Sequence, residues 1–166
     1  IIETIAKKND LETIIWREVP VNPDQIGSSA RSLMPKIEQL LVKTTKKIED
    51  EQLERKLYLT RKTCEKQIES FKSTEELKTI INREFYICSW SSRTLIYKGM
   101  LLVDQLRKFY PDLSNENFTS TFGLVHSRFS TNTLGSWKLA HPYRMLAHNG
   151  EINTVRGNRN WMQARE

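Results

Sequence analysis

One repeating pattern of apolar residues restricts the fold more than any other feature of the sequence. Between Glu51 and Phe71, apolar side chains recur at intervals of four, seven, four and three residues. They are Leu53, Leu57, Cys64, Ile68 and Phe71. Such intervals place all of them on one face of an α-helix, so they predict a helix over 51–71 with one buried stripe. Cys64 is then a core thiol rather than a nucleophile.

Runs rich in β-branched and aromatic residues come before this helix and follow it. Residues 11–21 read as a strand that ends at prolines, and 22–35 read as a loop because of their Pro, Gly and Ser content. Residues 36–44 fit either a helix or a strand, and we assign them to a strand. Further along, 83–90 and 93–99 are two β-rich runs on either side of Ser91-Ser92, which predicts a hairpin.

The last third of the chain is predicted to contain two more strands, 120–131 and 144–149, joined by a long loop at 132–143. Ser73 and Glu76 form a possible capping box for a short helix reaching Ile81. Residues 101–113 are mixed, and a further helix begins at Glu151. Because strands come in pairs and helices cluster between them, the order predicts an α+β fold with antiparallel sheet.

Composition limits the classes of protein that the chain can represent. It has 166 residues, with 38% hydrophobic and 28% charged, which is typical of one folded globular domain. Its apolar runs are shorter than the roughly 18 residues needed to span a bilayer. The two cysteines, Cys64 and Cys88, lack metal-ligand spacing. They fit either a disulfide or two reduced thiols of a cytoplasmic protein, and we adopt the second interpretation.

The net charge of +6 is unevenly distributed. Acidic and basic residues interleave over 42–83, as on solvated helix faces, which argues against a nucleic-acid partner. Between Glu116 and Glu166 the one acidic residue is Glu151, whereas six arginines and lysines lie there. Such a cationic segment suits either a small carboxylate substrate or an ordinary basic surface.

Polar residues gather where two predicted strands end, in "VHSRFSTNT" (125–133) and "AHNGEINT" (147–154). Arg128 has a planar guanidinium that suits a carboxylate, although a strand arginine is often part of an ion pair. Asn149 offers a side-chain amide, and Gly150 lets a backbone N–H approach a substrate closely. The Asn-Gly pair therefore fits either an oxyanion hole or a hairpin turn.

The stretch "FGLVHSRFSTNTLGSWKLAHPYRMLAHNGEINTVRGNRNWMQARE" resembles the glutaminase domain of glutamate synthase large subunits, a class II glutamine amidotransferase domain. The resemblance extends back through "WREVPV", "ERKLYLTRK" and "YICSWSSRTLIYKGML", so it covers most of the chain. It implies a four-layer αββα sandwich of the N-terminal-nucleophile hydrolase type with antiparallel sheets. A cysteine at the first residue of the mature protein is the nucleophile of that family.

The resemblance also assigns roles to individual residues. Arg128 is expected to bind the α-carboxylate of L-glutamine, with Thr131 and Asn132 near the same substrate. Asn149 and Gly150 are expected to form the oxyanion hole. The family's product, ammonia, is passed to 2-oxoglutarate at a flavin site in another domain.

This sequence departs from the family pattern at the nucleophile, because neither Cys64 nor Cys88 lies at an N-terminus. Residues 1–166 are therefore expected to be the central part of a glutaminase domain, truncated at both ends and inactive alone. The acidic residue that binds the glutamine α-amino group is expected beyond Glu166. FMN and a [3Fe-4S] cluster are implied for the full-length family protein, outside these residues.

The resemblance implies as partners the synthase and FMN domains of the same polypeptide and an electron-donating small subunit or ferredoxin. Two alternatives stay open at this point. The chain fits another class II glutamine amidotransferase, which delivers ammonia to a different acceptor. It also fits a non-catalytic binding module that retains the fold.

Overall fold

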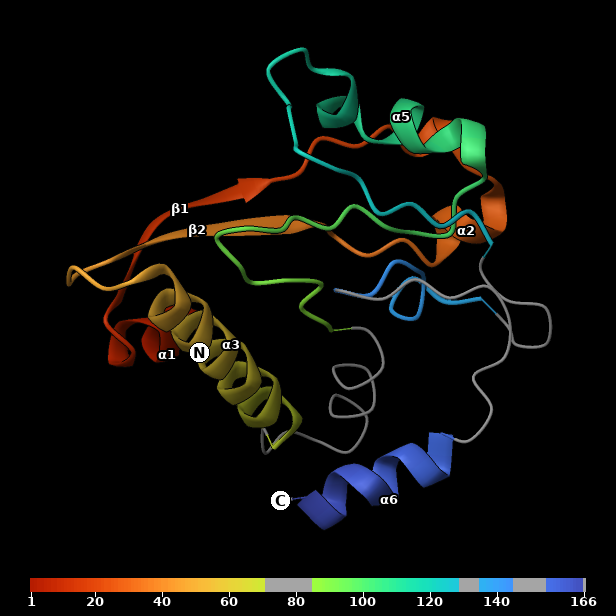
Figure 1. Ribbon diagram of the computed structural model, residues 1–166. Helices are drawn as coiled ribbons and strands as arrows, with labels where there is room; N and C mark the ends of the chain where they lie inside the picture. Colours follow the sequence, from red (N-terminus) through yellow and green to blue (C-terminus); the bar gives the residue numbers. More distant parts are fainter. Residues whose placement is uncertain (71–84, 129–134, 145–154, 166) are drawn as a thin grey trace.

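The computed structural model describes residues 1–70, 85–128, 135–144 and 155–165 (Figure 1). Within them, helices accompany one antiparallel sheet of two strands, β1 (Leu11–Glu18) and β2 (Glu38–Thr44). This arrangement confirms the predicted α+β class. The α-helices are α1 (Ile2–Lys8), α2 (Ser28–Ser32), α3 (Asp50–Glu69), α5 (Leu106–Phe109) and α6 (Val155–Arg165). Short 3₁₀ helices are η1 (Pro23–Gln25), η2 (Val103–Gln105) and η3 (Pro111–Ser114). None of the described helices is both long and apolar enough to cross a membrane.

The two strands confirm the assignment of 11–21 from its β-rich composition and the choice of strand over helix for 36–44. Leu11 pairs with Thr44 and Glu18 with Glu38, and the register shifts between Thr13 and Ile15. Such a shift is typical of a β-bulge, which locally increases the twist of a strand. The pairing ends soon after β1, where the Val19 amide donates to Ile37 at 3.0 Å, so the predicted strand over 11–21 is three residues too long.

Residues 22–35 correct the prediction of an unstructured loop. They contain η1 and α2, two short helices that share an ion pair of 3.0 Å between Asp24 and Arg31. Pro23 begins η1, and its fixed φ angle suits the first position of a helix. The Pro, Gly and Ser content correctly predicted that these residues are not part of a strand. It did not predict the two helical turns that they form.

Helix α3 confirms the apolar spacing of the sequence. Leu57 and Cys64 are buried, and Leu53 packs at the edge of a small core formed by Ala6, Leu11 and Leu57. Helix α1, which the sequence did not predict, supplies Ala6 and packs across α3. Helix α6 confirms the prediction of a helix near the end of the chain.

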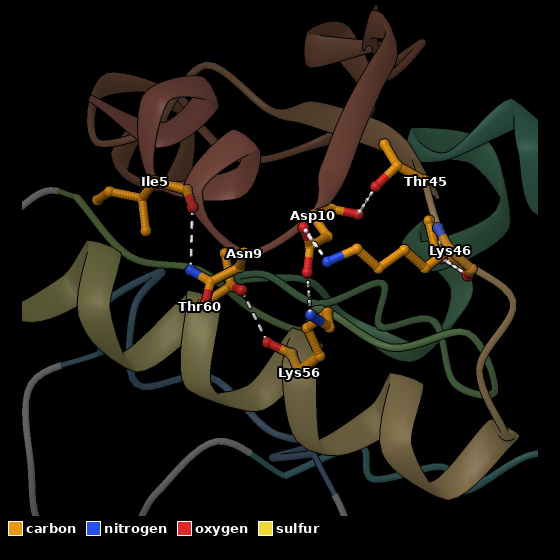
Figure 2. A network of polar contacts seen from close by, with 8 residues as sticks. Ile5, Asn9, Asp10, Thr45, Lys46, Lys56 and Thr60 are labelled. Carbon is orange, nitrogen blue, oxygen red and sulfur yellow. Dashed lines mark hydrogen bonds and ion pairs between the residues drawn. The ribbon is translucent and has the colours of Figure 1, made fainter.

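Asp10 joins α1, β1 and α3 through a network of polar contacts (Figure 2). Its φ angle of 57° lies in the left-handed region, which Asp tolerates better than most residues. Its carboxylate accepts from Lys46 and from Lys56, each at 3.0 Å, and its carbonyl accepts from the Thr45 amide at 3.0 Å. These bonds lower the pKa of Asp10, Lys46 contributing most. One residue thus fixes the chain reversal between α1 and the sheet.

The predicted hairpin over 83–99 is wrong in its strands, although it places the reversal correctly. Residues 85–90 and 93–98 form no strand. The bend between them is instead held by α3, because the hydroxyls of Ser91 and Ser92 donate to Glu54 at 2.8 and 2.7 Å. Side-chain bonds to a helix replace the ladder that a hairpin would supply.

Other parts of the sequence prediction fall on the last third of the chain. Residues 120–128, predicted as the first part of a strand, contain none. The predicted loop is confirmed over 135–143, where only turns and bends occur. The mixed stretch 101–113 folds as η2, α5 and η3. The predicted short helix ending at Ile81 and the body of the predicted strand 144–149 lie outside the described residues.

A second, aromatic core holds the far end of the molecule together. Phe109, Tyr110 and Trp137 are buried with Val19 and Ile26. The ring centroids of Phe109 and Tyr110 lie 4.7 Å apart, edge to face, and those of Phe109 and Trp137 lie 5.6 Å apart. Such contacts add to the stabilisation from area burial.

Trp137 packs directly against the backbone of Gly99. A Cβ at Gly99 would lie 2.9 Å from Cε3 of Trp137 and closer still to Cζ3. No side chain larger than hydrogen fits there unless the indole moves. The indole is 4% exposed, and its Nε1 donates to the carbonyl of Ala30 at 2.9 Å, so it has little freedom to move.

We predict that Gly99→Ala destabilises the fold by about 1–3 kcal/mol, the usual cost of overpacking a core. Urea unfolding followed by tryptophan fluorescence measures the change. Gly27→Ala is the matched control, because a Cβ there meets nothing within 4 Å. Equal stability of the two variants would show that Trp137 adapts without cost.

A second polar network ties the sheet to η3. Arg17 donates to Gln39 at 2.8 Å and to Asp112 at 2.6 Å, and the Tyr97 hydroxyl donates to the other oxygen of Asp112 at 2.7 Å. The Arg17 bond, followed by the Tyr97 bond, holds the pKa of Asp112 below its usual value. The carboxylate is therefore favoured in the folded state.

This pKa shift has a defined consequence for stability. A depressed folded pKa contributes stability above the unfolded value, about 3.9, and that contribution is lost as the pH falls through the folded pKa. Asp112→Asn should therefore lower the free energy of unfolding at pH 7 by about 1–3 kcal/mol, and by less at pH 3. Urea unfolding at both pH values measures this, with Asp24→Asn, at an exposed ion pair, as control. A loss that does not depend on pH would contradict the assignment.

Candidate functional site

Of the five residues that the sequence predicts at the site, Arg128 is the one that the structure describes. Thr131, Asn132, Asn149 and Gly150 lie outside the described residues. Arg128 is the last residue of the described range 85–128, and its side chain is exposed. Its guanidinium forms no ion pair with any carboxylate of the described ranges, which removes the ion-pair alternative within them.

A histidine holds the backbone of Arg128. The Arg128 amide donates to Nδ1 of His126 at 3.2 Å. Because Nδ1 accepts this bond, the neutral imidazole carries its proton on Nε2. That Nε2 is buried and has no hydrogen-bond partner among the described residues. His126 is thus fixed in one tautomer beside the predicted carboxylate-binding residue.

Three aromatic rings are in contact near Arg128 in the chain: two stacked histidines and a tilted tyrosine. The rings of His126 and His141 lie 4.6 Å apart with an interplanar angle of 25°, and Tyr143 follows at 4.5 Å from His141. The stack joins the segment of Arg128 to the segment that leads toward Asn149 in the sequence. Sequence reasoning did not assign a role to His141 or Tyr143, because nothing in a local pattern shows that they meet His126.

The turn before His141 is anchored from two sides. Trp137 enters the aromatic core described above, and Ala140 is buried at the end of the turn. On the other side lies the ammonium of Lys98, which donates to the carbonyls of Lys138 at 2.6 Å and Ala140 at 3.1 Å. The same turn is therefore held by apolar packing and by a charged donor.

Lys98 is an unusual lysine, since it is only 8% exposed. Burial lowers the pKa of its ammonium, yet no described carboxylate pairs with it. The Tyr86 ring lies 5.0 Å from Nζ, within cation–π range. The backbone of Lys98 is fixed as well, because the buried Tyr110 hydroxyl donates to its carbonyl at 2.8 Å.

A second cation fixes the residue just before the stretch that contains Asn149. Arg144 donates to the carbonyl of Ile87 at 2.5 Å and lies 3.5 Å from Glu65 of α3. Glu65 also accepts from Arg61 at 2.7 Å. Burial lowers the pKa of Arg144. A hydrogen bond between a cation and a backbone carbonyl thus lies near each end of the segment 138–144. Lys98 donates near its start, and Arg144 donates at its end.

Neither thiol has the environment of a nucleophile. Cys64 is fully buried in α3, and burial raises its pKa to about 11. Burial also raises the pKa of Cys88, although Lys98 and Arg144 oppose the shift. Because the thiolate is the reactive form, both thiols are less reactive than a free cysteine. This confirms the prediction that Cys64 is a core thiol.

An open groove of about 1170 Å³ lies elsewhere, between the sheet and residues 85–98 and 110–118. Trp16, Leu40 and Trp90 are among its lining residues, and Arg128 is not. The described residues contain no cluster of three or more His, Cys, Asp or Glu side chains with the spacing of a metal site.

Comparison with known proteins decides the family. Residues 1–166 match the family described as "Glutamine amidotransferases class-II". The chain belongs to the class II glutamine amidotransferases.

Within this family, the chain is similar to glutamate synthases. The large chain of NADPH glutamate synthase from Azospirillum brasilense is 52% identical over 91% of this chain, which covers 9% of that protein. The corresponding protein from Bacillus subtilis is 49% identical over 99% of the chain, and ferredoxin-dependent glutamate synthase 1 from Arabidopsis thaliana is 48% identical over all of it. Each of these two is covered to 10% of its length. The chain thus spans about a tenth of the curated relatives that it matches.

We predict that iodoacetamide alkylates Cys64 in the folded protein at pH 7 roughly 100-fold more slowly than a cysteine peptide, whose pKa is about 8.5. Cys88 should react more slowly than the peptide too. Mass spectrometry of digested samples gives both rates. Unfolding in urea is the control, because it should equalise them. Rapid labelling of either thiol in the folded protein would contradict the environments described above.

Proposed function

We propose that the chain is part of the glutaminase domain of a glutamate synthase, which hydrolyses L-glutamine to glutamate and ammonia. The observation that carries the proposal is the near-complete coverage of the chain by glutamate synthases, with about half of the positions identical. The ammonia is then passed to 2-oxoglutarate, which forms a second glutamate in another domain.

The proposed architecture is the four-layer αββα sandwich of N-terminal-nucleophile hydrolases, of which residues 1–166 form the central part. The antiparallel pairing of β1 and β2 and the helices α1 and α3 that pack together support it. A sandwich of this kind needs more strands than the two observed, so its other strands come from other residues.

Substrate binding is assigned to Arg128 and to the residues that follow it in the motif. The guanidinium binds the α-carboxylate of L-glutamine through two parallel, charge-assisted hydrogen bonds. Its exposure and its lack of a described carboxylate partner support this role. Thr131 and Asn132, a few residues further along, contact the same substrate.

The chemistry is acyl transfer through a thioester. A thiolate attacks the side-chain amide of glutamine, and the carbonyl oxygen becomes an anion in the tetrahedral intermediate. The side-chain amide of Asn149 and the backbone N–H of Gly150 stabilise this oxyanion. The amide nitrogen takes up a proton as the C–N bond breaks and leaves as ammonia. Water then hydrolyses the thioester to release glutamate.

The nucleophile in this proposal is a cysteine outside these 166 residues, with its free α-amino group as base. The raised pKa values of Cys64 and Cys88 support their exclusion. The same two cysteines do not fit an iron–sulfur cluster, which is held by several Cys thiolates: Cys64 is buried within α3, and only two thiols exist in the chain. The [3Fe-4S] cluster of the full-length protein is therefore assigned to other residues, and the FMN is assigned to the synthase domain that the family resemblance implies. Electrons come from a small subunit or from ferredoxin.

Two variants of the full-length protein test the proposed roles. Arg128→Ala should mainly raise KM for glutamine, because the carboxylate contact exists in both the ground and transition states. Asn149→Ala should lower kcat by roughly 100- to 1,000-fold, since its donor matters most when the oxyanion forms. Steady-state kinetics of glutamine-dependent glutamate synthesis measures both parameters.

The matched control is the same reaction with ammonium in place of glutamine, which both variants should still catalyse. Normal glutamine-dependent turnover of a folded Asn149→Ala variant would favour the alternative interpretation, in which Asn149-Gly150 is a hairpin turn. A wild-type protein that releases ammonia from glutamine but makes no glutamate from 2-oxoglutarate would indicate a different class II amidotransferase. A wild-type protein without glutamine hydrolysis would indicate a binding module.

A further inference from the structure

We infer that Lys98 is a positioning residue for glutamine binding, which places Arg128 through the turn at 138–140 and the stacked rings of His126 and His141. The inference rests on the proposed function and adds a residue that does not itself contact substrate. Every contact in the route lies within the described residues.

The first step of the route is a charged donor with two backbone acceptors. The Lys98 ammonium donates to the carbonyls of Lys138 and Ala140, and such charge-assisted bonds are short and directional. Two acceptors two residues apart define the orientation of the turn, which a single bond would not. The Lys98 carbonyl is itself held by the Tyr110 hydroxyl in the aromatic core.

The second step connects the turn to Arg128. His141 directly follows Ala140, and its ring stacks on His126 at 4.6 Å. His126 in turn accepts the Arg128 amide at Nδ1. A shift of the turn therefore moves His141, and the stack transmits that shift to the backbone of Arg128.

Apolar packing alone does not give this control. Trp137 holds the start of the turn by apolar packing and by its Nε1 bond to Ala30, but neither contact involves the carbonyls of Lys138 and Ala140. Removing the ammonium would leave two carbonyls without their donor, one of them from the buried Ala140, and the turn would rotate to find other donors. Lys98 therefore sets the orientation of the turn, whereas Trp137 fixes the start of the turn against the aromatic core.

The expected kinetic effect follows from the role of Arg128. A misplaced Arg128 weakens binding of the α-carboxylate equally in the ground and transition states, so KM rises while kcat is retained. Changes along a contact network of this kind typically amount to roughly 2- to 30-fold. We expect an increase of that size in KM for glutamine in Lys98→Met.

The experiment uses the full-length protein, four test variants and one control variant. Lys98→Met keeps the length of the side chain but removes the donor, and Lys98→Arg keeps charge and donors. His141→Ala cuts the route after the turn, and the fourth variant combines Lys98→Met with His141→Ala. Lys43→Met is the matched control, because Lys43 is exposed on β2 and pairs only with Glu12 among the described residues.

The double variant tests the route itself. If Lys98 acts through His141, the increase in KM for the double variant should not exceed the larger of the two single increases. Lys98→Arg should restore KM at least in part. Lys43→Met should match the wild type, and synthesis from ammonium should be unchanged in all variants.

Several results would overturn the inference. They are an unchanged KM in folded Lys98→Met, a loss confined to kcat, an equal loss of the ammonium-dependent reaction, or additive effects in the double variant. If Lys98→Met does not fold, His141→Ala decides, since an unchanged KM there breaks the route. Failure of the proposed function looks different, because the wild type itself would then not hydrolyse glutamine.

Discussion

The packing of the Trp137 indole on the bare backbone of Gly99 is the contact on which the site-bearing half of the molecule depends. It brings the turn at 135–140 against the aromatic core and, through the Nε1 bond to Ala30, joins residues 107 positions apart. Because hydrogen is the one side chain that fits under the indole, the two segments approach closely enough for Lys98 to reach the carbonyls of the turn. The polar contacts around Arg128 are built upon this apolar one.

The positive charge of the chain has two different physical roles. Lys98, which is buried, and Arg144, which is exposed, donate to backbone carbonyls and thereby cross-link separate segments of the chain. Arg156, Arg159 and Arg165 lie on the exposed surface of α6. A net charge of +6 therefore does not describe one basic face, because part of the positive charge is used for contacts between segments of the chain.

Sequence patterns correctly predicted the elements that are stabilised mainly by interactions between residues close in the sequence. The spacing of Leu57 and Cys64 was sufficient for α3, because a helix satisfies its own backbone. β-rich composition was insufficient over 85–98, since strand propensity describes fit to a sheet surface and those residues bond to Glu54 and to the turn instead. Helix α1 was missed because its short apolar face makes sense only against α3.

The same difference between local and long-range interactions applies to the residues of the candidate site. The family resemblance was sufficient to propose roles for Arg128, Asn149 and Gly150, because those roles depend on chemical type and on order along the chain. It did not reveal Lys98 or His141, whose importance lies in what they touch about 15 to 40 residues away. A sequence motif thus names the groups that meet a substrate, whereas the groups that aim them emerge only when distant segments are placed in space. On the inference drawn above, the position of Arg128 therefore depends on the turn at 138–140 as well as on the motif that contains it.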